Sequence, residues 1–445
     1  MTPAVRLRVA HVALVLLAAA YVVQLVRPLH LEPDSVCYLL TAEKVAQGQG
    51  YGCPGCPKQH CSIVFPPGYP AMLSALIRTG WATAWSFVIV NLLFLALGLV
   101  AAYGLCRRSF GLGPDGSFAV CGLTLLSYPV FRYVNTPLSD FLFLGLALLS
   151  VLALVAAAAL QGWTRAGAIA AGAILAGFAI LTRTIGVALI PAIFWACLGG
   201  SSAPARLRAL LRGPSRAVVI GVGVGALLAV GCAAFVWLRH SDYVRGLGAQ
   251  YGRGLGGTLL RAWGYRVTEL GELFANAPAA KLPAPLHVFI SALGAVGVMV
   301  LAYCAWSKRA DAGPAEVFAL TYAMILFVWP FADVRFWIPI LPLLAAWVFW
   351  LLRRGGLSRP VRLAVAGYAA LFCLTGVVGI GYNTRISFSG RRFPGFFHDR
   401  YLAPVYRVAW EEPEPGDSVA ADSAALRVLR AYEPRLRTLG SGHGW

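Results

Sequence analysis

The sequence predicts an all-α, polytopic membrane protein, and three observations support that prediction. Of its 445 residues, 59% are hydrophobic and 12% are charged, whereas soluble domains carry about 25% charged residues. The mean hydropathy is +0.72. Apolar runs of about 20 residues recur along the chain, which is the length that a helix needs to cross a bilayer. A single soluble globular core is therefore excluded.

Run length predicts about eleven membrane-spanning helices. They are expected at residues 9–27, 82–106, 117–133, 138–160, 167–182, 184–200, 217–238, 286–306, 315–331, 336–352 and 363–382. The first run continues beyond three alanines at 18–20, so it predicts an uncleaved span, with a cleaved signal peptide as the alternative.

Basic residues gather in short loops on one side of these spans, for example at Arg107, Arg165 and Arg353. Arg6 and Arg8 lie on the same side, so the positive-inside rule places the N-terminus in the cytoplasm. An odd number of spans then places the C-terminus outside. The net charge of +19 reflects loop residues that set topology and contact anionic lipid, so nucleic acid is not an expected partner. The expected location is the inner (plasma) membrane.

The chain divides into a transmembrane domain, residues 1–382, and a small extracytoplasmic C-terminal segment, residues 383–445. Two long outer segments interrupt the transmembrane domain, at 28–81 and 239–285. In the second, residues 259–274 predict an amphipathic helix that lies in the membrane interface. The first is polar and contains a short amphipathic helix, and we expect it to be the catalytic segment.

Four cysteines, Cys37, Cys53, Cys56 and Cys61, share the first outer segment. Disulfide bonds are the first expectation for cysteines outside the cytoplasm. A zinc site formed by Cys53, Cys56, Cys61 and His60 is the alternative, and unpaired thiols also remain open.

Six charged residues lie near the outer ends of the predicted spans, on one face of the membrane: Asp34, Arg132, Asp140, Arg183, Asp333 and Arg335. Ionisable side chains are costly at membrane depth and often mark a functional site. A carboxylate can take a proton from a hydroxyl, and arginines bind phosphate and stabilise charge that develops on it. These groups suit sugar transfer from a lipid phosphate. A single base with direct displacement implies inversion at the anomeric carbon.

The first outer segment also carries a sequence motif. An acidic residue is followed by Tyr38, Leu39, Glu43, Gly48, Gly50 and Tyr51, and later by Phe65-Pro66-Pro67-Gly68-Tyr69-Pro70. Three further landmarks follow in order: Pro137-Leu138-Ser139-Asp140, Leu181-Thr182-Arg183 and the stretch 335–342. Together they resemble the GT-C superfamily of membrane glycosyltransferases. The resemblance is greatest to bacterial relatives of dolichyl-phosphate-mannose–protein mannosyltransferases and to the lipid A aminoarabinose transferase, and it covers residues 10–350.

The resemblance implies a role for each matching residue. Asp34 is expected to be the catalytic base, and Asp140 the second acidic position, which orients the acceptor or a metal. The donor phosphate is expected to contact Arg132, Arg183 and Arg335. The other motif residues are expected to shape the loop and contact substrate: Glu32, Tyr38, Tyr51, Pro67 and Tyr69. Many family members have Asp-Glu where this chain has Asp34 and Ser35, which leaves the class of acceptor open.

The sequence therefore predicts an inverting glycosyltransferase that uses a polyprenyl-phosphate-linked hexose or pentose at the outer membrane face. The acceptor is a lipid, glycan or protein hydroxyl, no cofactor is required, and a divalent cation remains open. A transporter or flippase for a lipid-linked or small polar substrate is the alternative. Transporters are often built from inverted repeats, and the two halves of this chain show no such match.

Overall fold

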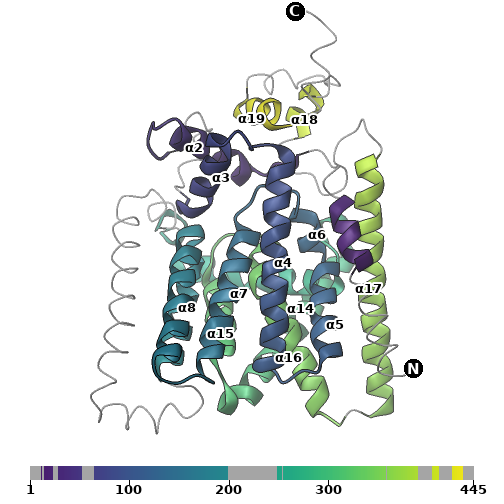
Figure 1. Cartoon of the computed structure of the whole chain (residues 1–445). Helices are drawn as coiled ribbons and strands as arrows, with labels where there is room; N and C mark the ends of the chain where they lie inside the picture. Colours follow the sequence, from purple (N-terminus) through teal and green to yellow (C-terminus); the bar gives the residue numbers. More distant parts are fainter. Residues whose placement is uncertain are drawn as a thin grey trace, which may run out of the picture.

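A computed structural model describes residues 12, 15–23, 29–52, 65–198, 248–252, 254–356, 358–388, 403–409 and 423–433. All regular structure in these ranges is helical (Figure 1). The α-helices are α2 (Pro33–Ala46), α3 (Gly68–Arg78), α4 (Ala84–Arg108), α5 (Pro114–Leu126), α6 (Tyr128–Tyr133), α7 (Asp140–Ala157), α8 (Gly162–Thr182), α9 (Leu189–Leu198), α13 (Leu255–Ala275), α14 (Ala284–Lys308), α15 (Pro314–Val328), α16 (Leu341–Arg354), α17 (Arg359–Phe388), α18 (Ala403–Ala409) and α19 (Ala424–Tyr432). Short 3-10 helices are η2 (Thr184–Ala188), η3 (Ala279–Lys281), η4 (Arg309–Asp311) and η5 (Val334–Ile340).

The described part of the chain has six helices that are long and apolar enough to cross a membrane, so the protein is a multi-pass membrane protein. They are Ala84–Arg108, Asp140–Ala157, Gly162–Thr182, Ala284–Asp311, Val334–Arg354 and Arg359–Tyr382. Two shorter apolar helices, Thr184–Leu198 and Pro314–Val328, match two more of the expected spans. The span expected at 217–238 lies outside the described residues, and that at 9–27 is described only in part.

The single helix expected over 117–133 is instead two helices, α5 and α6. Ser127 has extended backbone and ends the first helix. Pro129 follows in the first turn of the second helix, where its missing backbone N–H has no consequence for helix hydrogen bonding. The side chain of Asn276 forms hydrogen bonds with the backbone groups on either side of the break. It donates to the carbonyl of Leu126 at 2.9 Å and accepts from the N–H of Tyr128 at 2.7 Å.

Helix α7 lies at the centre of the bundle and packs closely against α4 and α8. A Cβ atom on Gly145 would lie 2.9 Å from the carbonyl oxygen of Phe94 in α4, so only glycine permits this approach. The hydroxyl of Ser150 donates to the carbonyl of Gly172 in α8 at 2.7 Å. Small residues and hydroxyls that allow helix backbones to approach are typical of membrane helix packing.

Helix α13 contains the amphipathic stretch that was expected to lie in the membrane interface; that placement stays a prediction, and the structure shows what its polar residues contact. Gly271 of α13 and Gly294 of α14 lie where a Cβ atom would clash with the facing backbone, so the two helices pack in direct contact. The charged residues Arg266 and Glu269 are buried. The amphipathic pattern thus reflects a buried polar contact inside the protein.

The two ends of the helix bundle carry different kinds of residues and segments. At one end, basic residues bind groups near the ends of helices: Lys308 pairs with Glu316 and donates to the carbonyl of Ser109 at 2.8 Å, and Arg353 donates to the carbonyl of Gly111. At the other end α2 and α3 lie with α18 and α19 (Figure 1). The helices of the bundle therefore bring the first outer segment and the C-terminal segment to the same end.

The described parts of the C-terminal segment hold helix α2 in place. The hydroxyl of Tyr406 in α18 accepts from the N–H of Leu31 at 2.8 Å and donates to the carbonyl of Leu29 at 2.7 Å. The hydroxyl of Tyr432 in α19 donates to Glu43 in α2 at 2.8 Å. Both the approach to α2 and the helix itself are thus fixed by residues from the far end of the chain.

Candidate active site

The start of α2 presents Asp34 to the helix bundle. Pro33 occupies the first turn, where a missing N–H has no consequence for helix hydrogen bonding. The backbone N–H of Glu32 donates to the hydroxyl of Ser35 at 3.2 Å. Asp34 lies in the same first turn, where a negative charge is favoured by the helix dipole. The local sequence therefore fixes Asp34 at the end of a well-defined helix.

Aromatic residues of the first outer segment pack α2 onto α3. The ring of Tyr38 lies 4.5 Å from that of Phe65 and 5.0 Å from that of Tyr69. Gly68 meets the carbonyl of Leu181 at a distance that excludes a Cβ atom. Tyr38 and Tyr69 are buried, so in the described structure they support the segment from within.

Two other residues of the motif occupy the edge of this segment. Tyr51 is partly exposed, and its hydroxyl donates to the carbonyl of Phe65. Pro67 precedes the first residue of α3, as its N-cap. The Phe65–Pro70 motif thus directs the chain into α3, beside the end of α8 that precedes Arg183.

Asp34 forms an ion pair with Arg335 of η5, through a terminal guanidinium nitrogen. The Nε atom of Arg335 lies 2.8 Å from Asp333, whose other carboxylate oxygen accepts from the backbone N–H of Arg335 at 3.0 Å. The hydroxyl of Tyr133 donates to the same oxygen at 3.2 Å. Arg335 therefore lies between two carboxylates, one from its own loop and one from the first outer segment.

A second ion pair joins Arg183 and Asp140. Asp140 is the first residue of α7 and its side chain is 0% exposed. Arg183 also reaches the hydroxyl of Ser139 at 3.4 Å, and that hydroxyl lies 3.1 Å from the hydroxyl of Tyr38. The other carboxylate oxygen of Asp140 has no hydrogen-bond partner among the described residues.

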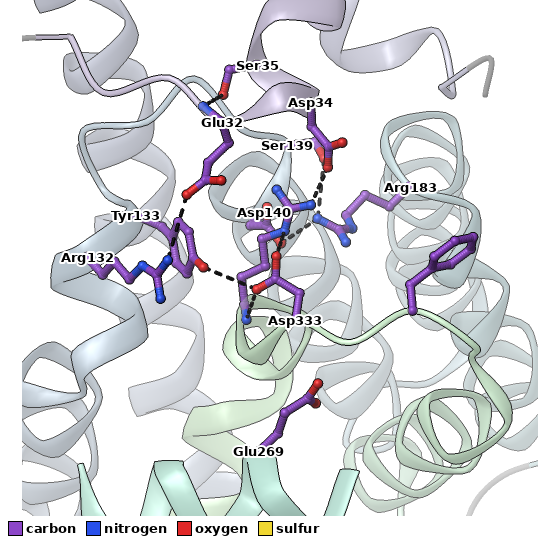
Figure 2. A network of polar contacts seen from close by, with 12 residues as sticks. Glu32, Asp34, Ser35, Arg132, Tyr133, Ser139, Asp140, Arg183, Glu269 and Asp333 are labelled. Carbon is purple, nitrogen blue, oxygen red and sulfur yellow. Dashed lines mark hydrogen bonds and ion pairs between the residues drawn. The ribbon is translucent and has the colours of Figure 1, made fainter. Parts of the chain in front are cut away.

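Arg132 lies on the opposite side of this group and pairs with Glu32 rather than with Asp34 or Asp140, at 3.9 Å. Its guanidinium also lies 4.7 Å from the centre of the Tyr133 ring. Figure 2 shows the resulting row of charged side chains, with Glu32 and Arg132 at one side, Asp140 in the middle and Arg183 at the other side. Four elements contribute to this row: α2, α6, α7 and the loop after α8.

Three guanidinium groups surround the ring of Phe336. The carbon at the centre of each group lies 5.2 Å from the ring centre for Arg183, 5.5 Å for Arg335 and 5.8 Å for Arg266. Cations at such distances are attracted to the ring face. Phe336 therefore contacts arginines from three separate parts of the chain.

Arg266 and Glu269 of α13 form a buried pair beneath η5, at 2.7 Å. The indole N–H of Trp337 donates to Glu269 at 2.8 Å, and Arg266 donates to the carbonyl of Phe331. Burial raises the pKa of Glu269 to about 7, although Arg266 opposes the shift. This pair holds η5, and hence Arg335, from the side opposite to α2.

The structure thus brings Asp34, Asp140, Arg183 and Arg335 together, whereas the roles expected for them in catalysis and donor binding stay predictions. Sequence reasoning assigned no role to the residues that hold them: Asp333, Tyr133, Phe336, Arg266 and Glu269. The signal for Asp333 was present, because it lies two residues before Arg335 at the start of a predicted span. The candidate zinc ligands Cys53, Cys56, His60 and Cys61 lie outside the described residues. Among the described residues, no group of three His, Cys, Asp or Glu side chains is arranged to hold a metal ion.

Comparison with known proteins gives matches in structure alone. No family model matches the sequence, and no curated protein matches it. The archaeal oligosaccharyltransferase AglB from Archaeoglobus fulgidus, in complex with an inhibitory peptide and a dolichol-phosphate, is similar with a TM-score of 0.51 at 13% identity. The match covers 92% of this chain and 58% of the AglB chain. The chain therefore spans little more than half the length of that relative.

Two structures of ArnT from Cupriavidus metallidurans are also similar. The apo structure matches with a TM-score of 0.48 at 17% identity, over 94% of this chain and 72% of that one. The structure bound to undecaprenyl phosphate matches with a TM-score of 0.48 at 16% identity, over 97% and 74%.

Proposed function

We propose that this protein, whose fold is that of the GT-C glycosyltransferases, is an inverting glycosyltransferase that uses a polyprenyl-phosphate-linked sugar. One observation carries the proposal: Asp34 contacts Arg335 next to the pair of Asp140 and Arg183, at one end of a membrane bundle. A base and phosphate-binding groups are thus within reach of one another. A fold by itself does not establish an activity, so the proposal depends on this site.

In the proposed reaction, the acceptor hydroxyl oxygen attacks the anomeric carbon of the donor sugar while Asp34 takes the hydroxyl proton. The bond between that carbon and the phosphate oxygen breaks, and polyprenyl phosphate leaves. Arg335 and Arg183 stabilise the negative charge that develops on the phosphate. One displacement on the face opposite to the leaving group inverts the anomeric carbon.

The proposed orientation places this site outside the cell. The end of the bundle opposite to the site carries Arg107, Arg353 and Lys308 at helix ends, and such basic ends favour the cytoplasmic side. Eleven spans, a cytoplasmic N-terminus and an outer C-terminus in the inner membrane agree with this distribution. The donor therefore reaches the site from the outer leaflet.

The proposed donor class is supported by the chemistry of the site. AglB was solved with a dolichol-phosphate and an inhibitory peptide, so the same fold accommodates a lipid phosphate. In this chain, Arg183 and Arg335 present two guanidinium groups at the outer end of the bundle, where a membrane lipid can bring a phosphate. A hexose or pentose is the proposed sugar, and a lipid, glycan or protein hydroxyl the acceptor.

The proposed mechanism requires no cofactor. A divalent cation is the alternative for charge stabilisation, because Asp34 and Asp140 supply oxygen ligands of the kind that Mg²⁺ and Ca²⁺ prefer. Assay with and without a chelator separates the two. Activity that survives chelation supports the arginine mechanism, and activity restored by added Mg²⁺ or Mn²⁺ supports the cation.

The proposal is tested with the purified protein in lipid vesicles, a panel of polyprenyl-phosphate sugars and an envelope extract as the source of acceptor. Free polyprenyl phosphate is followed by mass spectrometry. Release that requires both donor and extract supports a transferase and identifies the sugar. A transporter or flippase is indicated instead if the donor crosses the bilayer without release of its sugar.

A further inference from the structure

We propose that Arg335 has two alternative partners, Asp34 in the donor-free protein and the lipid phosphate in the donor complex. In this proposal Asp333 is the positioning residue that keeps Arg335 in the site while the partners exchange. The inference rests on the proposed function and adds to it a mechanism by which donor binding releases the base.

Asp333 contacts the backbone N–H and the Nε atom of Arg335, and so leaves the two terminal guanidinium nitrogens of Arg335 available to other partners. One carboxylate oxygen of Asp333 accepts from the backbone N–H of Arg335 at 3.0 Å, and the other lies 2.8 Å from its Nε atom. The hydroxyl of Tyr133 donates to Asp333 at 3.2 Å. Because Asp333 is two residues from Arg335 and is itself held by Tyr133, these contacts persist whatever the terminal nitrogens bind.

Asp34 contacts Arg335 only through one terminal guanidinium nitrogen. Asp34 belongs to a different element, α2, and its side chain is 31% exposed, compared with 10% for Arg335. Among the described residues, Arg335 is the sole ion-pair partner of Asp34. A carboxylate with this exposure is readily rehydrated, so its separation from Arg335 has a small free-energy cost.

The charge balance of the site requires such an exchange. Each guanidinium of the site already has a carboxylate partner: Arg132 with Glu32, Arg183 with Asp140, Arg266 with Glu269, and Arg335 with both Asp34 and Asp333. An incoming phosphate therefore finds no guanidinium without a counterion among the described residues of the site. It binds at low cost only where a carboxylate can leave.

Of Arg183 and Arg335, the two arginines that face Asp140 and Asp34, Arg335 is the one at which this exchange is easier. Asp140, the partner of Arg183, is fully buried at the start of α7, and separating a buried pair leaves an uncompensated charge. Arg335 keeps Asp333 when Asp34 leaves. The exchange also has a chemical consequence, because the carboxylate oxygen that contacts Arg335 becomes available to the hydroxyl group of the acceptor.

The test measures the binding of polyprenyl phosphate without sugar to the full-length protein in detergent, by native mass spectrometry, for wild type and Asp34→Asn. Exchange predicts that Asp34→Asn binds about fivefold more tightly, because a competitor for Arg335 has been removed. If Asp34 acts as a base but does not compete for Arg335, wild type and Asp34→Asn should bind polyprenyl phosphate equally. Asp115→Asn is the control, because it removes the same charge at an exposed position at the other end of the bundle, and its binding should be unchanged.

The role of Asp333 is tested with the same probe. Asp333→Asn should weaken binding, and Asp34→Asn should no longer tighten it in that background, because Arg335 is no longer held. In turnover assays Asp333→Asn should mainly raise KM for the donor, whereas Asp34→Asn should mainly lower kcat. Thermal unfolding of each variant identifies any that fail to fold.

The outcomes separate this inference from the proposed function. Equal binding by wild type and Asp34→Asn, or equal tightening by Asp115→Asn, overturns the exchange while leaving the transferase proposal intact. Absence of polyprenyl phosphate binding in every folded variant overturns both.

Discussion

Asp34 and Arg335 form an ion pair across 301 residues of sequence. The pair joins the first turn of α2, which lies in the first outer segment, to η5, which precedes α16. It therefore connects the first outer segment to the helix bundle at the point where we propose that the donor phosphate binds. The neighbouring pair of Arg183 and Asp140 differs in one respect, because Asp140 is fully buried.

The buried pair makes a prediction about stability. Arg183→Ala leaves the charge of Asp140 unpaired in the bundle, and we expect it to lower the free energy of unfolding by about 3–5 kcal/mol. The double variant Arg183→Ala with Asp140→Asn should recover most of that loss, since the unpaired charge is gone. Thermal unfolding in detergent measures both. Additive losses in the double variant would show that the two side chains are not coupled.

Tyr406 of the C-terminal segment makes a prediction about turnover. Tyr406→Phe removes the partner of the Leu31 N–H and the Leu29 carbonyl, which costs about 1–3 kcal/mol for buried groups left without a partner. Because residues 29–31 lead directly into α2, we expect turnover to fall while the affinity for polyprenyl phosphate changes little. Tyr303→Phe, at an exposed position on α14, is the matched control. Equal turnover by Tyr406→Phe and Tyr303→Phe would show that the C-terminal segment does not help to position Asp34.

The sequence predicted the composition of the site better than its contacts. Asp34, Asp140, Arg183 and Arg335 were recognisable because each is a charged residue at the end of an apolar run, where burial is costly. Their pairing was not predictable, since Asp34 meets Arg335 only after the whole bundle has folded. Arg132 illustrates the limit, because nothing in the sequence indicated that it pairs with Glu32; its assignment to the donor phosphate stays a prediction.

Periodicity alone also does not show what a polar helix face contacts. Arg266 and Glu269 give α13 an amphipathic pattern, and the structure buries both of them beneath η5. The break between α5 and α6 was missed for a related reason. An apolar run does not reveal that a distant side chain, Asn276, forms hydrogen bonds with the backbone groups of Leu126 and Tyr128 on either side of the break.

Glu269 makes a prediction about pH. Its pKa is raised from 4.5 to about 7 by burial, so the folded protein binds this proton more tightly than the unfolded chain does. Between those values the unfolded state loses the proton first, and stability therefore falls as pH rises, by about 3 kcal/mol in total.

Glu269→Gln removes this titration. We expect the stability of the variant to depend less on pH between 4.5 and 7 than that of wild type, with the difference measured by thermal unfolding at several pH values. Asp115→Asn, which changes an exposed carboxylate at the other end of the bundle, is the control. Parallel pH profiles for wild type and Glu269→Gln would contradict the raised pKa.

The most direct test of the account compares turnover of wild type and Asp34→Asn under conditions in which both bind polyprenyl phosphate. Asn keeps the shape of the side chain and removes its basicity. We predict that release of polyprenyl phosphate, with acceptor present, falls by at least about 100-fold in Asp34→Asn, while Asp115→Asn retains wild-type turnover. Equal release by wild type and Asp34→Asn would contradict the central claim that Asp34 is the base.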